Sequence, residues 1–192
     1  MLTNHVTPLV NFRQIEVVRV PVLREKLTCF THVYDLQGAI GYRNTAIYDA
    51  QGNACYKSWS IAAFVNLETG RLSRIPREVQ NALQFAPRLD MTYGSRKIEL
   101  PAAPLTPLAP FRVLRDDIDY NNHVNNAQYI RIALECLPED FQVSDLRVEY
   151  KKPVLPGSSI TPVVTYGPNT AYVVLMVEES VCCVVEFTSC GA

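Results

Sequence analysis

Hydrophobic and polar positions in the first third of the chain follow the pattern of β-strands. Four segments rich in β-branched and aromatic residues are separated by short polar turns. These segments are residues 7–21, 25–35, 38–49 and 54–66. The sequence DAQGN at residues 49–53 is typical of a hairpin turn between the last two. The pattern therefore predicts an antiparallel sheet.

A proline-rich stretch separates this sheet from the rest of the chain. Residues 101–110, PAAPLTPLAP, hold four prolines in ten positions, and each removes a backbone donor and favours extended backbone before it. Ahead of it, Pro76 suits the first position of one short helix. We expect a first half at residues 1–75, a short helix and linker at 76–110, and a second half at 111–192.

The second half begins with a strand at residues 111–115 and then shows helical periodicity. Its apolar stripe ends before Pro138 and comprises Ala127, Ile130, Ala133, Leu134 and Leu137. Four strand candidates follow, at 144–152, 158–166, 170–179 and 181–189. Because VVLMV and VCCVV are apolar at every position, the sheet should be covered on both faces in places. We predict an α+β fold, with a curved antiparallel sheet wrapping one central helix.

Polar chemistry is concentrated just before that helix. Residues 116–126, DDIDYNNHVNN, hold three carboxylates, four asparagines and one of the three histidines. In an extended segment Asp119, Asn121 and His123 would face the same side, as an acid, an amide and an imidazole. Asn125 and Asn126 stand where the helix begins, so an asparagine cap and free N–H groups could polarise a carbonyl nearby. On spacing alone a structural loop is the more common interpretation, because Asp and Asn side chains often bond local backbone and a single loop histidine is more often structural than catalytic.

Composition narrows the possible partners. A net charge of -1 gives no general attraction to nucleic acid or membrane. No stretch approaches the roughly 20 apolar residues of a membrane span, and the N-terminus lacks the features of a signal peptide, which predicts a cytoplasmic protein. The six cysteines show no C-x-x-C spacing and should be small buried hydrophobes. We expect neither a metal nor a cofactor.

The segment RDDIDYNNHVNNAQYIRIALECLP, residues 115–138, resembles the signature of the acyl-ACP thioesterases. The strands EVVRVPVLREKLTCFTHVYD and LRVEYKKPVLPGS resemble strands of that family in the same order. The resemblance implies a tandem (double) hotdog fold. It implies an enzyme of fatty acid biosynthesis that hydrolyses the thioester between a fatty acyl chain and acyl carrier protein (ACP). It also implies that Asp119, Asn121 and His123 are catalytic.

The sequence departs from the family pattern in two places. The family's plant members carry Glu and Cys shortly after the run that is here Glu149–Lys152, but Pro153 and Val154 follow it. Either Asp119 takes over the work of that Glu or turnover is weak. In addition, no long helix precedes the first strands, so the resemblance implies a truncated, incomplete first hotdog.

The incomplete first half suggests a partner for its sheet. Apolar residues two apart should form one face, as in the pairs Val10 with Phe12, Ile15 with Val17 and Trp59 with Ile61. That face would be unusually apolar for a soluble monomer. We therefore expect a homodimer that covers it.

Further residues are candidates for binding substrate. Trp59 lies either in the core or along an acyl pocket, and Asn125 and Asn126 lie at the helix start. Arg147, Lys151 and Lys152 form either a solvated face or a docking patch for acidic ACP. An acyl-CoA thioesterase and a non-catalytic protein that binds acyl groups or ACP remain alternative interpretations.

Overall fold

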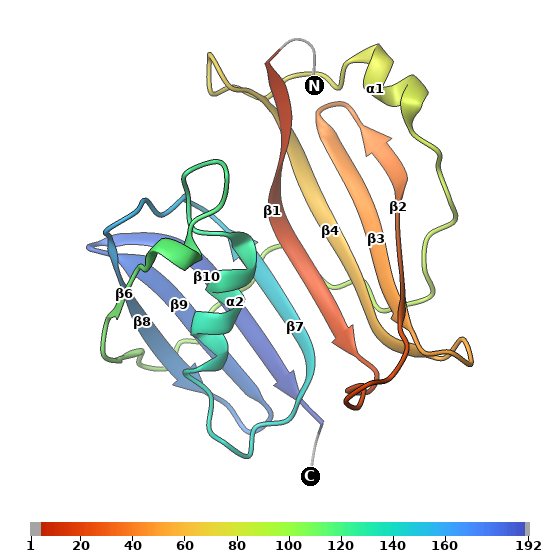
Figure 1. Ribbon diagram of the computed structural model, residues 1–192. Coiled ribbons are helices and arrows are strands. Elements are labelled where there is room, and N and C mark those ends of the chain that lie inside the picture. Colours follow the sequence, from red (N-terminus) through yellow and green to blue (C-terminus); the bar gives the residue numbers. More distant parts are fainter. Residues whose placement is uncertain (1–4, 191–192) are drawn as a thin grey trace. The chain divides into compact units, whose positions relative to one another are not determined.

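The computed structural model describes residues 5–190 and divides the chain into two compact units, residues 1–94 and 95–192. The first holds strands β1 (Val6–Val17), β2 (Thr28–Gln37), β3 (Ile40–Tyr48) and β4 (Ala54–Asn66), and helix α1 (Arg77–Ala82). The second holds β5 (Thr106–Pro107), β6 (Phe111–Arg112), the 3₁₀ turn η1 (Arg115–Asp117), α2 (Asn126–Leu134), β7 (Val143–Tyr150), β8 (Ser159–Tyr166), β9 (Thr170–Val177) and β10 (Ser180–Ser189). Figure 1 labels most of these elements.

The first unit is an antiparallel sheet in the order β2-β3-β4-β1. Residues 85–94 are here called the covering segment. They start beside the edge strand β2, where Phe85 bridges Val33, and continue over one face of the sheet. Met91 and Tyr93 pack against Phe12, Trp59 and Ile61. Residues 76–94 therefore belong to the first unit, and the proline-rich stretch belongs to the second.

Side chains of the sheet hold the backbone of the covering segment. Asn44 Oδ1 accepts hydrogen bonds from the N–H of Leu89 and the hydroxyl of Tyr93, both at 3.1 Å. Gln14 Oε1 accepts the N–H of Gly94 at 2.9 Å. These hydrogen bonds supply acceptors for backbone N–H groups of a segment that forms few backbone–backbone hydrogen bonds.

The prediction that these apolar residues share one face of the first sheet was wrong, because a β-bulge changes which residues of β1 lie on the same face. The register shifts between Val10 and Phe12, so that Val10 pairs with Ala62 and Phe12 with Ile61. Ala62 and Ile61 are neighbours on β4 and therefore face opposite sides of the sheet. Their partners Val10 and Phe12 consequently face opposite sides as well. Ile15 pairs with Ser58, on the face opposite Trp59 and Ile61. The covering segment shields the face that carries Phe12, Trp59 and Ile61.

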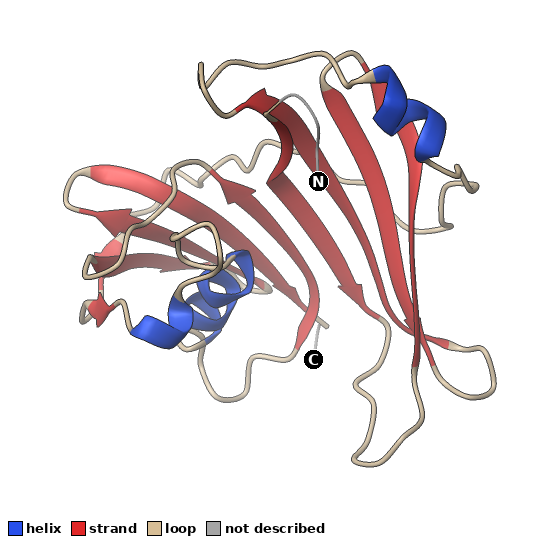
Figure 2. Cartoon of the chain, turned by 45° about the horizontal axis from the view of Figure 1, so that its top comes forward, coloured by secondary structure: helices blue, strands red, loops and turns tan. Residues whose placement is uncertain are grey.

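In the second unit the sheet order is β7-β10-β9-β8, with β5 and β6 both pairing with β8. Helix α2 lies against this sheet (Figure 2). Ile132 and Ala133 of the helix and Phe187 of β10 are almost completely buried. On the other face Ile98 packs against Val174 and Val184. The predicted curved sheet around one helix is confirmed, although the helix ends at Leu134 and not at Leu137.

No helix among residues 5–190 combines the length and the apolar character needed to cross a lipid bilayer.

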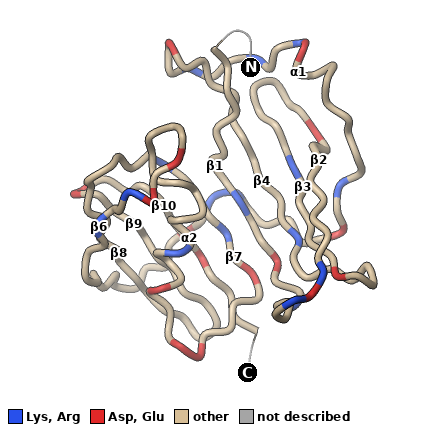
Figure 3. Tube along the Cα trace, in the orientation of Figure 1, with Lys and Arg blue, Asp and Glu red and all other residues tan. Residues whose placement is uncertain are grey.

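A cluster of ion pairs stabilises the loop between β1 and β2. Figure 3 colours the charged residues of this loop. Arg19 pairs with Glu25 and, at 2.9 Å, with Asp49. Asp49 Oδ1 also accepts the N–H groups of Gln51 and Asn53. The Arg19 side chain, followed by the hydrogen bonds from Asn53, lowers the pKa of Asp49 from 3.8 to about 2. Because the pKa is depressed in the folded state, this contribution to stability is present above pH 3.8 and is lost as the pH falls towards 2.

We therefore expect Asp49→Asn to flatten the acid limb of the stability curve. Asparagine can still accept the loop N–H groups but carries no charge for Arg19. The free energy of unfolding in urea, measured at about pH 5 and about pH 3, should fall less in this variant than in the unchanged chain. Asp90→Asn, at an exposed aspartate, is the control. An equal fall in all three proteins would contradict the prediction.

Candidate active site

The candidate catalytic residues lie on a tight loop and not on an extended strand. Ile118 and Val124 form an isolated antiparallel bridge, and the Asp119 N–H donates to the His123 carbonyl at 2.8 Å. The Asn122 N–H donates to the Asp119 carbonyl at 3.0 Å, and Asn122 has a φ of 61°. The alternation expected for Asp119, Asn121 and His123 is therefore wrong, because the chain reverses between them.

The reversal nevertheless brings two of the three together. Next to the Ile118–Val124 bridge, Asp119 lies opposite His123, and directly opposed residues of an antiparallel pair have side chains on the same side. Both are half-buried, whereas Asn121 is exposed at the turn. The Asn121 N–H donates to Asp119 Oδ1 at 2.8 Å. The loop thus sets an acid opposite an imidazole on one side, with no hydrogen bond or ion pair between the two side chains in the described residues, and the turn fixes the acid.

Asn125 caps helix α2, as the sequence predicts. Its Oδ1 accepts the N–H of Ala127 at 2.9 Å, and its carbonyl accepts the N–H of Gln128 at 2.8 Å. The N–H of Asn126, at the first helical position, has no intrahelical acceptor. It is the first-turn donor that a substrate oxygen can use. A substrate-binding role for Asn125 and Asn126 stays a prediction.

Asp117 anchors the loop, a role that the sequence analysis missed. This buried carboxylate accepts the N–H of Leu114 at 2.7 Å and pairs with Arg131 of α2 at 2.9 Å. Its carbonyl accepts the N–H of Asn125 at 2.8 Å. The sequence shows only that Asp117 precedes the predicted helix and that Arg131 lies within it. Such an arrangement is too common to predict an ion pair. Asp117 ties η1, the loop and the helix start into one piece.

The stretch that differs from the family pattern lies against the loop. Val154 accepts the N–H of Val124 at 2.9 Å through its carbonyl and donates its own N–H to the Tyr129 hydroxyl at 3.0 Å. Burial raises the pKa of Tyr129 to about 12, and the charge of Asp119 adds a smaller contribution. Val154 is itself buried, and Pro153 is exposed. Pro153 offers neither carboxylate nor thiol, and Asp119 is the carboxylate whose backbone position lies opposite His123.

An open cavity of about 530 Å³ lies beside this loop. Its lining comprises Val113, Leu114, Arg115, Ile118, Asn122, Pro156 and Gly157. Asn122, the residue between Asn121 and His123, joins the cavity to the loop.

The other candidate residues have partners within their own units. Trp59 is buried in the core of the first unit, where its indole N–H donates to Gln14 Oε1 at 2.9 Å. Its ring centroid lies 5.1 Å from that of Phe12 and 5.2 Å from that of Tyr93. This placement favours the core interpretation over a pocket lining.

The expected basic patch in the second unit is largely neutralised. Arg147 pairs with Glu186, which is its neighbour in the β7–β10 register, and donates to the carbonyl of Ser95 at 2.8 Å. Lys151 pairs with Glu149 at 2.6 Å, and Lys152 donates to Ser180 at 3.0 Å. The cross-strand pair of Arg147 with Glu186 is not visible in a local sequence pattern, whereas Lys151 and Glu149 are only two residues apart.

The curved sheet around α2 and the loop at the helix start define a protein of the hotdog class. Sequence models of the acyl-ACP thioesterase family match both units, the N-terminal domain at residues 1–83 and the C-terminal domain at residues 106–187. The chain belongs to the acyl-ACP thioesterase family.

Relatives and solved structures agree with this assignment. A chloroplastic acyl-(acyl-carrier-protein) hydrolase of Cuphea viscosissima is 28% identical over 172 residues, which cover 81% of this chain and 40% of that protein. A chloroplastic dodecanoyl-(acyl-carrier-protein) hydrolase of Cinnamomum camphora is 25% identical over 137 residues, which cover 67% and 36%. The chain thus spans two fifths or less of these curated relatives.

The solved structures establish the fold. An acyl-ACP thioesterase from Bacteroides thetaiotaomicron matches with a TM-score of 0.85 at 21% identity, over 96% of this chain and 76% of that one. The 12:0-ACP thioesterase from Umbellularia californica matches with a TM-score of 0.85 at 18% identity, over 96% and 75%. The predicted hotdog fold is confirmed.

Proposed function

We propose that this chain hydrolyses the thioester of fatty acyl-ACP, releasing a free fatty acid and the carrier protein. Membership of the family supports the reaction class. The observation that carries the proposal is the loop that sets Asp119 opposite His123 beside the start of α2. General-base hydrolysis needs a base, a group that orients it or the water, and a donor for the oxyanion, and this loop provides a candidate for each.

In the proposed mechanism water attacks the thioester carbonyl and gives a proton to His123. Asp119 orients the water or the imidazole, and Asn121 holds Asp119 through the hydrogen bond of its N–H. The oxygen that becomes negative faces the N–H of Asn126 and the positive end of the helix dipole. As the carbon–sulfur bond breaks, His123 returns the proton to the leaving thiolate. The acid leaves as a carboxylate after losing its proton to solvent.

Asp119 carries the role that a Glu after Lys152 would otherwise take. Its Oδ1 accepts the N–H of Asn121, whereas no hydrogen bond among residues 5–190 uses its Oδ2. That second oxygen is available to a water molecule. Catalysis through a single half-buried carboxylate is consistent with the loop and with Pro153.

The direct test is release of free fatty acid from acyl-ACPs of several chain lengths. His123→Ala should lower the rate by more than about 100-fold, because a positioned base contributes about 10²–10⁴. His32→Ala, in β2 of the other unit, is the control and should retain full activity. Tight binding of acyl-ACP without release of acid would identify a binding protein instead. Faster hydrolysis of matched acyl-CoA would identify an acyl-CoA thioesterase.

ACP bearing an acyl-phosphopantetheine arm is the proposed partner, and fatty acid biosynthesis the proposed setting. A homodimer stays a prediction. A cytoplasmic location also stays a prediction, and the two curated relatives are named chloroplastic.

A further inference from the structure

The cavity beside the loop has the size and lining of a small-molecule site. Its volume of about 530 Å³ lies within the range of roughly 300–1,000 Å³ usual for ligand pockets. Val113, Leu114, Ile118 and Pro156 supply apolar walls. Arg115 is the charged residue of the lining, and Asn122 brings an amide. The cavity therefore suits a ligand that is largely aliphatic, with one anionic group.

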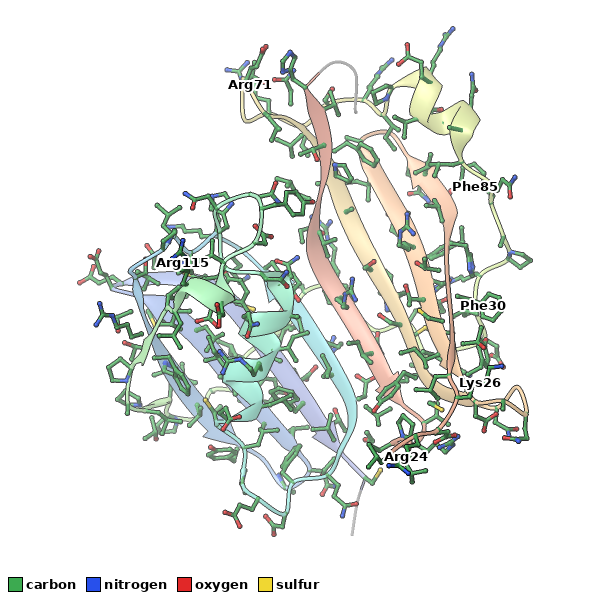
Figure 4. The ribbon with its side chains drawn as sticks, viewed as in Figure 1. Arg24, Lys26, Phe30, Arg71, Phe85 and Arg115 are labelled. Carbon is green, nitrogen blue, oxygen red and sulfur yellow. The ribbon has the colours of Figure 1, made fainter. Side chains whose placement is uncertain are left out.

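Arg115 is free to bind that anion. Among residues 5–190 it takes part in no ion pair and no side-chain hydrogen bond, and its exposed position is labelled in Figure 4. Arg131 and Arg147, in the same unit, both pair with carboxylates. The neighbouring Asp116 is exposed and also outside every ion pair of these residues. An unpaired guanidinium presents a planar set of donors that matches a phosphate.

The cavity also touches the candidate catalytic loop. Asn122 and Ile118 contribute to its lining, and Asn122 is the neighbour of both Asn121 and His123. A ligand that extends from Arg115 to Asn122 consequently has one end at the cation and the other at the loop. His123 is not among the lining residues of the cavity, but it directly follows Asn122 in the chain.

We propose that this cavity binds the phosphopantetheine arm of the substrate, with Arg115 pairing with its phosphate. The proposal rests on the proposed function, because it assigns the arm that carries the thioester. The gem-dimethyl group of the arm suits the apolar walls, and its amides suit the side chain of Asn122. ACP and coenzyme A share this phosphate-bearing arm, so the site recognises the chemistry common to both.

Two matched small thioesters test the phosphate contact. The same acyl group is attached to 4′-phosphopantetheine and to pantetheine, which lacks the phosphate. Arg115→Gln should lower kcat/KM for the phosphorylated substrate about tenfold, mostly through KM, and leave the other unchanged. Arg112→Gln is the matched control, since Arg112 is exposed in β6 but does not line the cavity. Acyl-ACP and acyl-CoA should both show the same loss with Arg115→Gln.

Other outcomes overturn the assignment. An equal loss with both small thioesters would make Arg115 a structural residue, and no loss with either would remove the contact. A loss confined to acyl-ACP would place Arg115 against the carrier surface instead. If the unchanged chain hydrolyses no thioester, the proposed function fails. Calorimetric titration with free 4′-phosphopantetheine then decides the site, because binding that Arg115→Gln weakens supports it and no binding overturns it.

Discussion

Asp119→Asn should reduce release of fatty acid from acyl-ACP by more than about 100-fold, with the fold unchanged. The substitution is conservative in structure, because asparagine keeps an oxygen that can accept the N–H of Asn121 and so retains the turn. It removes the negative charge opposite His123 and the basic oxygen available to water. The loss should be in kcat, since the proposed role belongs to the transition state.

Asp116→Asn is the matched control, because that carboxylate is exposed three residues earlier and has no partner among the described residues. Its rate should be unchanged. A thermal unfolding curve for each variant separates lost chemistry from lost structure. Retention of most of the activity in Asp119→Asn would remove Asp119 from the mechanism.

The second large effect concerns the stability of the second unit. Ile132 on α2 is 1% exposed, so Ile132→Ala should leave a cavity between the helix and the sheet. Substitutions of this kind cost about 2–5 kcal/mol. Leu134→Ala, at the end of the same helix and 42% exposed, should cost much less. Comparing the two separates burial from helix propensity.

Urea unfolding followed by circular dichroism measures this loss, because strands of both units contribute to the signal. Trp59 is the one tryptophan of the chain and lies in the first unit, so its fluorescence reports that unit. Ile132→Ala should therefore lower the urea concentration at the midpoint of the dichroism transition that belongs to the second unit. The fluorescence of Trp59 identifies the transition of the first unit. An unchanged dichroism curve would show that α2 does not contribute to the stability of its sheet.

Local patterns predicted the elements well, because their causes are local. Alternating β-branched residues marked the strands, and the apolar stripe with Asn125 at its start marked α2 and its cap. The end of the helix was predicted less well. Leu137 continues the stripe, but the backbone leaves the helix after Leu134.

Features that depend on contacts between distant residues were not predictable. The bulge between Val10 and Phe12 moves later residues of β1 to the other face of the sheet, and the local sequence Val-Asn-Phe at residues 10–12 does not predict it. Arg147 lies opposite Glu186 only through strand pairing. For the candidate site, the sequence selected Asp119 and His123 by assuming an extended strand. In the structure their backbone positions are opposed because the chain reverses between them.

The covering segment has a consequence for the order in which the first unit folds. Its N–H groups at Leu89, Thr92 and Gly94 bond to the side chains of Asn44, Glu16 and Gln14. These acceptors belong to β3 and β1, the two strands that flank β4. They come together only after both strands have paired with β4. We therefore expect residues 89–94 to become ordered after that three-stranded core has formed, and their bonded amides to exchange with solvent before those of the β1–β4 and β3–β4 ladders.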